Sequence, residues 1–476
     1  MVSPYSTLDE LARALRAKEV SSVELTKFYL ARLETYGEAL GAVVTITRER
    51  ALAEAAAADR DLAAGKTQNR PLLGIPYGVK DLLATKGIPT TWGAEPFRNQ
   101  VFDYDATVIE KLTNAGAVLV AKLAMVELAG GFGYNNADAS FTGPGRTPWN
   151  TAFWSGGSSA GPGAAVAAGL VPFAIGSETS GSILTPASFC GVTGVRPTYG
   201  AVSRHGAMAL SWTMDKLGPI ARTAADCNTI LGVIMGEDER DPTTSRVYPS
   251  GRASWVSSIV MTRAPNKRIA KIALVKGTWE NAQPVVRENF QKSVDVLKSL
   301  GHTIREIDYP DLPYGPATTT IIRAEGASAF EDLLRDGRAK QLRAVADKTG
   351  GFAASAILAI DYIRALRVRV KVREALLKLF EEHDLIAAPG RATLAFPIGV
   401  NFNDVYREVR SGPSIIASMN LLGAPAVCMP NGFGENSLPT SIQLNAAPAN
   451  EPLLLNAGIH FQLATDHHLK TPPRFP

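Results

Sequence analysis

Short apolar runs alternate with helical segments along this chain of 476 residues, and no Pro-, Ser- or Gly-rich linker separates them. The runs cover residues 117–121, 171–175, 272–275 and 385–388. Such alternation is typical of a sheet whose strands are buried on both faces beneath helices. We therefore predict one α/β domain over residues 1–476, with a central mixed, mainly parallel, twisted sheet covered by helices on both faces.

The first part of the chain has helical periodicity and lacks the short apolar runs of the rest. Capping signals at Ser6 and Ser22, followed by apolar residues at helical spacing, predict two helices, and an Ala-rich segment over 51–64 predicts a third. Residues 1–65 thus form an expected helical collar. The turn-rich stretch over 237–252 is the best candidate for an insertion or a boundary.

Composition and charge exclude several classes of protein. Hydrophobic residues make up 46% of the chain and charged residues 20%, so a large core can be buried. The net charge is only +4, and the densest basic run, 364–373, alternates with Leu and Val as a solvated helix face does. We therefore expect no nucleic-acid partner.

The cysteines and the N-terminus indicate a location. Cys190, Cys227 and Cys428 lie too far apart for short metal-binding spacings and are expected to be buried thiols. The sequence shows neither a signal peptide nor an apolar run of about 18 residues. We expect a cytoplasmic protein without membrane contact.

A Gly- and Ser-rich segment over 155–200 carries the sharpest local signals, and the residues alone leave three interpretations open. GSETSGS (176–182) approaches a phosphate-binding loop, but Ser182 stands where the lysine is needed. GSSAG (157–161) fits the nucleophile elbow of α/β-hydrolases, which would make Ser159 the nucleophile with a later histidine, although the preceding NTAFW is a poor strand. The small residues of 164–169 fit helix packing alone.

A lysine in an apolar run offers a different chemistry. Lys80 lies in GIPYGVKDLLATKG (74–87), where Ile75, Val79, Leu82 and Leu83 can desolvate it. A serine nucleophile needs a base, and a buried neutral lysine can act as one. This requires a pKa lowered from about 10.4 to near 7, or about 4 kcal/mol of destabilisation of the cation, and Asp81 must point elsewhere or be neutralised.

Together these segments resemble the amidase signature family of serine amidohydrolases, whose pattern is close to GGSSGG-x-A followed by GS-D-T-GGSIR-x-PA. Similar blocks extend over nearly the whole chain, including AKLAMVELA (121–129), GVRPTYGAVSRHGA (194–207) and NLLGAPAVCMP (420–430). The resemblance implies that 66–230 form the catalytic core and that 231–476 supply the rest of the sheet and the helices around the substrate pocket. It implies no metal or organic cofactor.

The resemblance also assigns expected roles to residues of this chain. Lys80 is the catalytic base, Ser158 the bridging serine after a cis peptide bond from Gly157, and Ser182 the nucleophile. Backbone N–H groups of Thr179, Ser180, Gly181 and Ser182 form the oxyanion hole, and Ala129, Gly130 and Ser158 bind substrate.

Three residues depart from the family pattern at the nucleophile turn. Glu178 replaces Asp, Ser180 replaces Gly, and Leu184 replaces the Arg of GSIR. We expect Glu178 to lack the arginine partner that supports this turn in the family. Ser180 would restrict the backbone if a positive φ were required there.

The leading functional hypothesis is a stand-alone amidohydrolase that cleaves C–N bonds of small or aryl amides, and of carbamates (urethanes), through an acyl-enzyme on Ser182. Its expected partner is the small-molecule amide or carbamate substrate, and the resemblance allows a homodimer. Aromatic residues are expected to line the pocket: Phe132, Tyr134, Phe141, Trp154, Tyr314 and Phe352. The alternatives are a glutaminase subunit of a tRNA-dependent amidotransferase, to which GVRPTYGAVSRHGA is similar, and an α/β-hydrolase-like esterase that uses Ser159.

Overall fold

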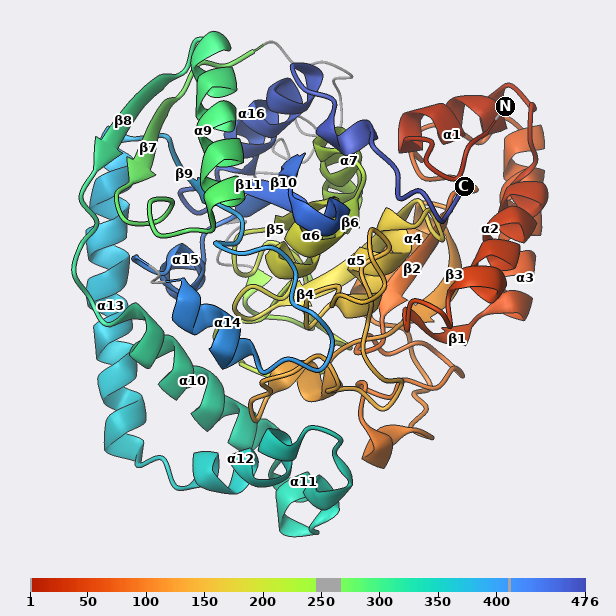
Figure 1. Cartoon of the computed structure of the whole chain (residues 1–476). Helices are drawn as coiled ribbons and strands as arrows, with labels where there is room; N and C mark the ends of the chain where they lie inside the picture. The colour runs from red at the N-terminus through yellow and green to blue at the C-terminus, as the bar shows by residue number, and fades with distance from the viewer. Residues whose placement is uncertain (1, 245–266, 410–411) are drawn as a thin grey trace.

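The computed structural model describes residues 2–244, 267–409 and 412–476 (Figure 1). Its strands form one eleven-stranded sheet that crosses the molecule. Across the sheet the order is β1 (Val43–Ile46), β3 (Val118–Leu123), β2 (Pro76–Lys80), β4 (Phe173–Glu178), β6 (Lys216–Ala221), β5 (Thr193–Arg196), β10 (Ala426–Phe433), β11 (Pro439–Ala446), β9 (Leu385–Pro389), β7 (Lys271–Val275) and β8 (Thr303–Ile307).

The predicted α/β fold with a mixed sheet is confirmed, but parallel pairing is confined to two groups. β2 is parallel to β3 and β4, and β7 is parallel to β8 and β9. Between these groups β6, β5, β10 and β11 pair antiparallel with their neighbours. The apolar runs in the sequence correspond to β3, β4, β7 and β9, all of which belong to the parallel groups. The antiparallel centre contains Gly, Pro, Asn and Gln, so its strands do not appear as apolar runs.

Helices cover both faces of the sheet because alternate residues of each strand point to opposite sides. One face packs under α1 (Leu8–Arg16), α4 (Thr107–Asn114), α7 (Ala224–Ile234), α9 (Pro284–Ser299) and α16 (Glu451–Leu463). The other packs under α3 (Arg48–Ala63), α5 (Ala160–Ala167), α6 (Leu184–Cys190), α10 (Tyr314–Ala329), α13 (Ala359–Glu382) and α15 (Ile415–Leu422). α2 (Ser22–Tyr36) contributes to the cores of both faces.

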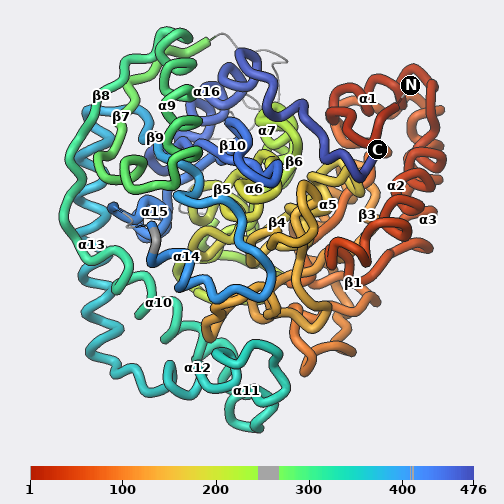
Figure 2. Tube along the Cα trace, viewed as in Figure 1, coloured from red at the N-terminus to blue at the C-terminus, as the bar shows by residue number. Residues whose placement is uncertain are grey.

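The N-terminal part is helical as predicted, with two changes. Thr7 and Ser21, one residue away from each predicted cap, form complete capping boxes with Glu10 and Glu24. β1 lies between α2 and α3 and pairs with β3, so this part also supplies an edge strand of the sheet. The two ends of the chain lie side by side near α1 (Figures 1 and 2), where the Tyr5 hydroxyl bonds to the carbonyl of Phe475.

The remaining elements surround the sheet edges. α10 and α13 form a projection at one side with α11 (Glu331–Arg335) and α12 (Val345–Ser355) (Figure 1). α14 (Phe402–Glu408) and the short helices η1 (Glu95–Phe97), η2 (Glu127–Gly130), η4 (Arg338–Gln341), η5 (Glu435–Ser437) and η6 (His467–Leu469) lie in connections. Residues 245–252 of the proposed boundary lie outside the described residues.

Several smaller predictions can be compared with the structure. The three cysteines are free and buried. The basic run 364–373 lies in α13, but only part of it is a solvated face. Arg369 donates to the carbonyl oxygens of Leu421 and Thr213, and Arg373 donates to that of Leu422. No helix in the described ranges combines the length and the apolar character needed to cross a bilayer.

Candidate active site

A buried hydrogen-bonded group lies at the carboxyl ends of two neighbouring strands of the sheet. It consists of Lys80, Ser158 and Ser177. Lys80 ends β2, and Ser177 is near the end of the neighbouring parallel strand β4, so the two side chains meet at the same edge. The Lys80 Nζ donates to Ser158 Oγ at 2.7 Å and to Ser177 Oγ at 2.9 Å. Sequence reasoning placed Lys80 and Ser158 together but missed Ser177, because strand alternation places Ser177 on the face of Val79 and Ile175 and not on that of Lys80.

The charge of Lys80 is controlled by its surroundings. Its side chain is 0% exposed. Burial lowers the pKa of Lys80 to about 7, although the carboxylates of Asp215 and Glu178 oppose this shift. Asp81 points away, as the sequence argument required, and its carboxylate pairs with Lys122 Nζ at 3.1 Å. A substantial fraction of Lys80 is therefore neutral near neutral pH and can accept a proton.

Ser182 lies beside this group but is not yet joined to it through its hydroxyl. Its backbone carbonyl accepts the N–H of Ser159 at 3.2 Å, and the residue is 9% exposed. Among the described residues the Ser182 hydroxyl has no hydrogen-bond partner, and it therefore makes no hydrogen bond to Ser158. The peptide bond between Gly157 and Ser158 is cis, as the resemblance implied.

The turn before α6 presents unpaired backbone donors. Gly181 adopts φ 92°, a left-handed conformation that favours glycine, whereas Ser180 does not have a positive φ and is not strained. Within the described ranges the N–H groups of Ser180, Gly181 and Ser182 make no hydrogen bond. They are thus available to an oxygen of a bound molecule.

Glu178 supports this turn with a partner that the sequence did not reveal. Its Oε2 accepts the N–H groups of Ile183 and Leu184 at 2.9 and 3.1 Å. Its Oε1 pairs with Arg196 Nη1 at 2.9 Å, so the expectation that Glu178 lacks an arginine was wrong. Burial alone would raise the pKa of Glu178, but Arg196 and Lys216 outweigh it and lower the pKa to about 2.

A second turn approaches the site from η2. Leu128, Ala129 and Gly130 have φ values of 50°, 56° and 84°, three successive left-handed residues. The N–H of Val126, just before them, donates to the Ser158 carbonyl at 3.1 Å. Two non-glycine residues in this conformation cost free energy and persist only where the surroundings enforce them.

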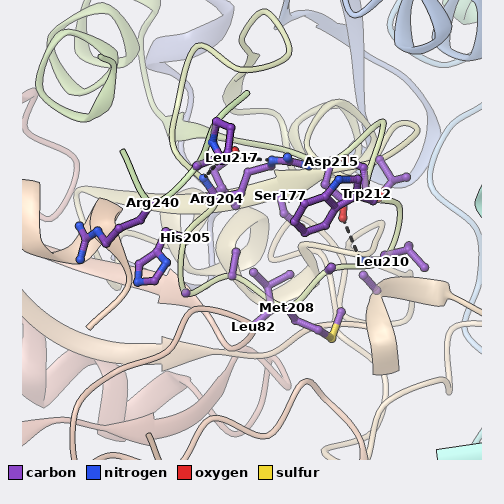
Figure 3. A pocket seen from close by; sticks show the side chains of 17 residues that line it. Leu82, Ser177, Arg204, His205, Met208, Leu210, Trp212, Asp215, Leu217 and Arg240 are labelled. Carbon is purple, nitrogen blue, oxygen red and sulfur yellow. Dashed lines mark hydrogen bonds and ion pairs between the residues drawn. The ribbon is translucent and has the colours of Figure 1, made fainter. Parts of the chain in front are cut away.

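A cavity of about 210 Å³ opens beside Ser177 and Thr179 (Figure 3). Most of its wall comes from the connection between β5 and β6, which includes Arg204, Trp212 and Asp215. The Trp212 side chain is 65% exposed, and the Arg204 guanidinium lies 5.3 Å from its ring centre. Sequence reasoning quoted GVRPTYGAVSRHGA from this connection but did not identify it as the cavity wall.

Asp215 connects the cavity to the nucleophile turn. Its Oδ1 accepts the Thr179 hydroxyl at 2.6 Å, and its Oδ2 accepts the N–H groups of Leu210 and Ser211 at 2.8 and 2.9 Å. Burial raises the pKa of Asp215, although these hydrogen bonds oppose the change.

The six aromatic residues expected around the pocket do not line this cavity. Tyr134 and Trp154 pack with Phe189, Phe396 and Phe402 in a separate buried cluster. Phe352 is on the surface. Of the predicted substrate-binding residues, Ala129 lines the cavity, whereas Gly130 and Ser158 do not.

The hydroxyl of Ser159, the alternative nucleophile, is engaged in the backbone. It donates to the Ser177 carbonyl at 3.2 Å and accepts the Ser177 N–H at 3.3 Å. The late histidine His383 faces the carbonyl of Leu379. This arrangement does not favour the α/β-hydrolase alternative.

Comparisons with known proteins show which family this chain resembles. The family model described as Amidase matches residues 24–455. The A-type subunit of glutamyl-tRNA(Gln) amidotransferase from Methylococcus capsulatus is 38% identical, and the match covers 98% of each chain. A solved chain from a vestigial protein complex, related to the origins of an s-triazine catabolic enzyme, superposes with a TM-score of 0.85 at 31% identity, over 96% of this chain and 98% of that one. Native peptide amidase from Stenotrophomonas maltophilia gives a TM-score of 0.83 at 27% identity, over 99% and 98%.

These relatives correct the leading functional hypothesis. The sequence favoured a stand-alone hydrolase of small or aryl amides and carbamates, but full-length curated relatives from several bacteria are named as the A-type subunit of an amidotransferase. The partner prediction is corrected for the same reason. A small-molecule substrate with no nucleic acid was expected, whereas the names of these relatives specify both a tRNA and a subunit. The scattered surface charge had weighed too heavily against that alternative.

Proposed function

Because the chain belongs to the Amidase family, whose enzymes act on C–N bonds, we propose that it is the A-type subunit of a tRNA-dependent amidotransferase. In this role it releases ammonia from the side-chain amide of glutamine, and the ammonia is used on glutamyl-tRNA. The observation that carries the proposal is the 38% identity to such an A-type subunit over 98% of both chains.

The buried lysine and two serines support a mechanism of amide cleavage in which these three side chains carry the proton transfers. Neutral Lys80 takes a proton from Ser158, and Ser158 takes one from Ser182 as the Ser182 oxygen attacks the amide carbon. The Ser182 hydroxyl must turn toward Ser158 for this step, and such contacts often tighten only when substrate binds. The leaving nitrogen gains the proton that Ser182 gave up, through Ser158, and departs as ammonia. Water then cleaves the acyl-enzyme on Ser182 to give glutamate.

The turn before α6 supports stabilisation of the oxyanion. The unpaired N–H groups of Ser180, Gly181 and Ser182 would donate to the oxygen that gains charge during attack. Thr179 joins this turn to the cavity through Asp215. Removal of one such donor typically raises the barrier by on the order of 2.7 to 4 kcal/mol, so the support that Glu178 gives to this turn is important for rate.

The cavity fits a small zwitterion better than a large apolar amide. Its volume of about 210 Å³ is below the range usual for drug-sized ligands. It is lined by the carboxylates of Asp215 and Asp241 and by the guanidinium of Arg204, which pairs with Asp241 at 3.3 Å. Charges of both signs complement the amino and carboxylate groups of a free amino acid. The Asp215 carboxylate has more lone pairs than its three donors use, so it can accept a further N–H.

The proposal is tested with the full chain and the partner subunits encoded in the same genome. Glutamine and glutamyl-tRNA(Gln) are supplied, ammonia is measured, and the tRNA-bound amino acid is identified by mass. We expect ammonia release and conversion of glutamate to glutamine on the tRNA, and loss of both in Ser182→Ala. Ser299→Ala, at an exposed helix end, is the control and should retain both activities. An assembled complex that leaves glutamine intact would overturn the proposal.

A further inference from the structure

Two carboxyl groups meet in the protein interior beside the left-handed turn of residues 128–130. Glu127 begins η2, and Asp347 lies in the first turn of α12. Both residues are 0% exposed. The steps proposed above use neither of them.

Glu127 holds the start of α12 through backbone donors. Its Oε1 accepts the N–H of Ala344 at 2.7 Å, and its Oε2 accepts the N–H of Arg343 at 2.8 Å. The Arg343 guanidinium does not neutralise it, because that group binds Asp138 at 2.6 and 3.0 Å. An anion at a helix N-terminus is favourable, so this carboxylate suits its place.

Asp347 has no comparable support. Within the described residues neither of its oxygens has a partner with good hydrogen-bond geometry. The groups that interact with its carboxyl are the Glu127 carboxyl and the N–H of Phe132. Burial, followed by the charge and hydrogen bond of Glu127, raises the pKa of Asp347 well above its usual range. A proton on Asp347 removes the repulsion between two adjacent buried carboxylates, and its O–H group can donate to Glu127.

Other titratable and charged groups on the surrounding elements do not replace that proton. Tyr134, in the segment after η2, is itself buried, and burial raises its pKa, so its phenol is neutral. In α10, Glu325 bonds Ser211, Thr213 and Tyr362. In η4, Arg338 bonds Asp336. The remaining charged groups on these elements and on α12 are Arg323, Lys340 and Lys348. Glu127 is the one side chain of this set whose interaction shifts the pKa of Asp347.

α12 packs directly on the segment that leads from this turn. A Cβ placed on Gly350 of α12 would lie 2.2 Å from the carbonyl oxygen of Phe132. On the other side the turn reaches the site, since Val126 bonds the carbonyl of Ser158 and Ala129 lines the cavity. The contact between Glu127 and Asp347 therefore joins α12 to a wall of the cavity.

We propose that Asp347 is a positioning residue: by sharing one proton with Glu127, it holds α12 on residues 127–132 and keeps Leu128, Ala129 and Gly130 in their left-handed conformation at the cavity. The inference rests on the proposed function in one respect, the assignment of the cavity that Ala129 lines to the glutamine substrate.

Loss of the shared proton has a defined consequence. When pH rises above the raised pKa of Asp347, this group becomes a carboxylate that repels Glu127. The turn then loosens, and the KM for glutamine rises by about fivefold, with a smaller change in kcat. In Asp347→Asn the side chain keeps its size, carries no charge, and can donate to Glu127 at every pH. This variant should show a KM that stays flat where that of the wild type rises.

The experiment measures kcat and KM for glutamine against pH in the assembled complex for wild type, Asp347→Asn and Asp347→Ala. Asp361→Asn, an exposed aspartate of α13, is the control and should follow the wild type. We expect Asn to remove the rise in KM that the wild type shows above the raised pKa of Asp347, and Ala to raise KM at all pH values. A rise in KM that is the same in wild type and Asp347→Asn overturns the proposal.

A second measurement separates this proposal from the proposed function. The pH dependence of unfolding by urea and of covalent labelling of Ser182 by a fluorophosphonate needs no glutamine. Wild type should lose stability as pH rises through the raised pKa of Asp347, and Asp347→Asn should not. If that difference is present but glutamine is not hydrolysed, the positioning role stands and the proposed function fails. If glutamine is hydrolysed but the difference is absent, the positioning role fails.

Discussion

Lys80 is a residue at which stability and chemistry oppose each other. Its ammonium form would be buried among apolar side chains, and this burial lowers its pKa to about 7. The same shift makes the amine a base near neutral pH. From an ordinary value near 10.4, the shift corresponds to about 4 kcal/mol of unfavourable free energy for the cation in the folded chain.

Replacement of Lys80 by Met should therefore stabilise the protein while it abolishes activity. The apolar side chain removes the unfavourable free energy of the buried cation, about 4 kcal/mol or less. The hydrogen bonds to Ser158 and Ser177 are lost as well. We expect a net gain of about 1 to 3 kcal/mol in the free energy of unfolding at pH 7. Urea unfolding monitored by circular dichroism measures it.

The pH dependence gives this prediction its control. The folded pKa lies below the unfolded value, so the unfolded chain binds more protons between about pH 7 and 10, and the wild type becomes more stable as pH rises through that range. The Met variant lacks this contribution, so the two stabilities converge at alkaline pH. Wild-type kcat/KM should fall below about pH 7, where Lys80 becomes protonated. A Met variant less stable than wild type at pH 7 would contradict this account of Lys80.

The limits of sequence reasoning are visible at single residues. The roles proposed for Lys80, Ser158 and Ser182 come from their motifs. Glu178 was compared only with Leu184, its neighbour in the motif, whereas its partner Arg196 comes from β5, two strands away from β4 in the sheet. Likewise Asp347 has no local pattern that relates it to Glu127. When the fold brings distant segments into contact, no regular spacing in the sequence indicates that contact.

At the scale of elements, α5 brings Ser158 close to the sheet. The helix contains only Gly, Ala, Pro and Val, all of them buried, as the small-residue composition predicted. At its start the Gly161 N–H donates to the Ala124 carbonyl at 2.8 Å. A Cβ on Gly161 would lie 2.4 Å from the Ala124 nitrogen and 2.4 Å from the Ala42 oxygen. Only glycine permits this approach.

Gly161→Ala should destabilise the chain and displace Ser158. The contacts are with backbone atoms, which cannot rotate away, so a loss of about 3 kcal/mol or more is expected. Thermal unfolding together with the rate of Ser182 labelling measures both effects. Gly315→Ala is the matched control, because its Cβ would have open space around it at an exposed position of α10. The control should be neutral or gain up to about 1 kcal/mol. Equal behaviour of the two variants would show that the close approach is unimportant.

The elements were predictable to the extent that their periodicity was simple. Apolar runs located β3, β4, β7 and β9, and capping residues located α1 and α2 to within one residue. β6, β10 and β11 contain Pro and polar residues, and they were not predicted. Those polar side chains are buried and bonded to one another across the sheet, for example Asn431 to Thr440. A buried polar strand has the amino-acid composition of a loop. Only the strands that pair with it in the folded sheet distinguish it from a loop.

At the scale of the whole molecule, Arg32 joins segments from both ends of the chain. Its guanidinium donates to the carbonyl oxygens of Ala168, Gly169 and Phe475 at 3.0, 2.8 and 3.3 Å. Arg32 belongs to α2, Ala168 follows α5, and Phe475 lies near the C-terminus. This one side chain thus connects the N-terminal helices, the core around the site and the last residues.

Arg32→Leu should lower the free energy of unfolding by about 2 to 4 kcal/mol, because buried carbonyl groups lose their donors. The midpoint of urea unfolding measures the loss. Arg13→Leu serves as the control, since Arg13 pairs with Asp9 on the exposed face of α1 and should contribute less than about 1 kcal/mol. A difference of less than about 0.5 kcal/mol between the two variants would argue against the role of Arg32.

The function of the whole molecule was the least predictable level. The motifs identify chemistry at a C–N bond, but a free-standing enzyme and one component of a larger complex share that chemistry. Charge scattered over the surface was taken to exclude nucleic acid, although a component of a complex can serve a tRNA-dependent reaction while partner chains make the contacts. No motif in the sequence distinguishes an exposed surface from one that a partner covers.

The position of Trp212 offers a direct optical signal. Its indole is largely open to water, rests beside the Arg204 guanidinium, and forms part of the cavity rim. A molecule that enters would displace water from this ring and alter its emission spectrum. Titration followed by intrinsic fluorescence would then report occupancy in the unmodified protein without any turnover. Trp212→Phe, which retains the other five tryptophans, is the reference for their emission.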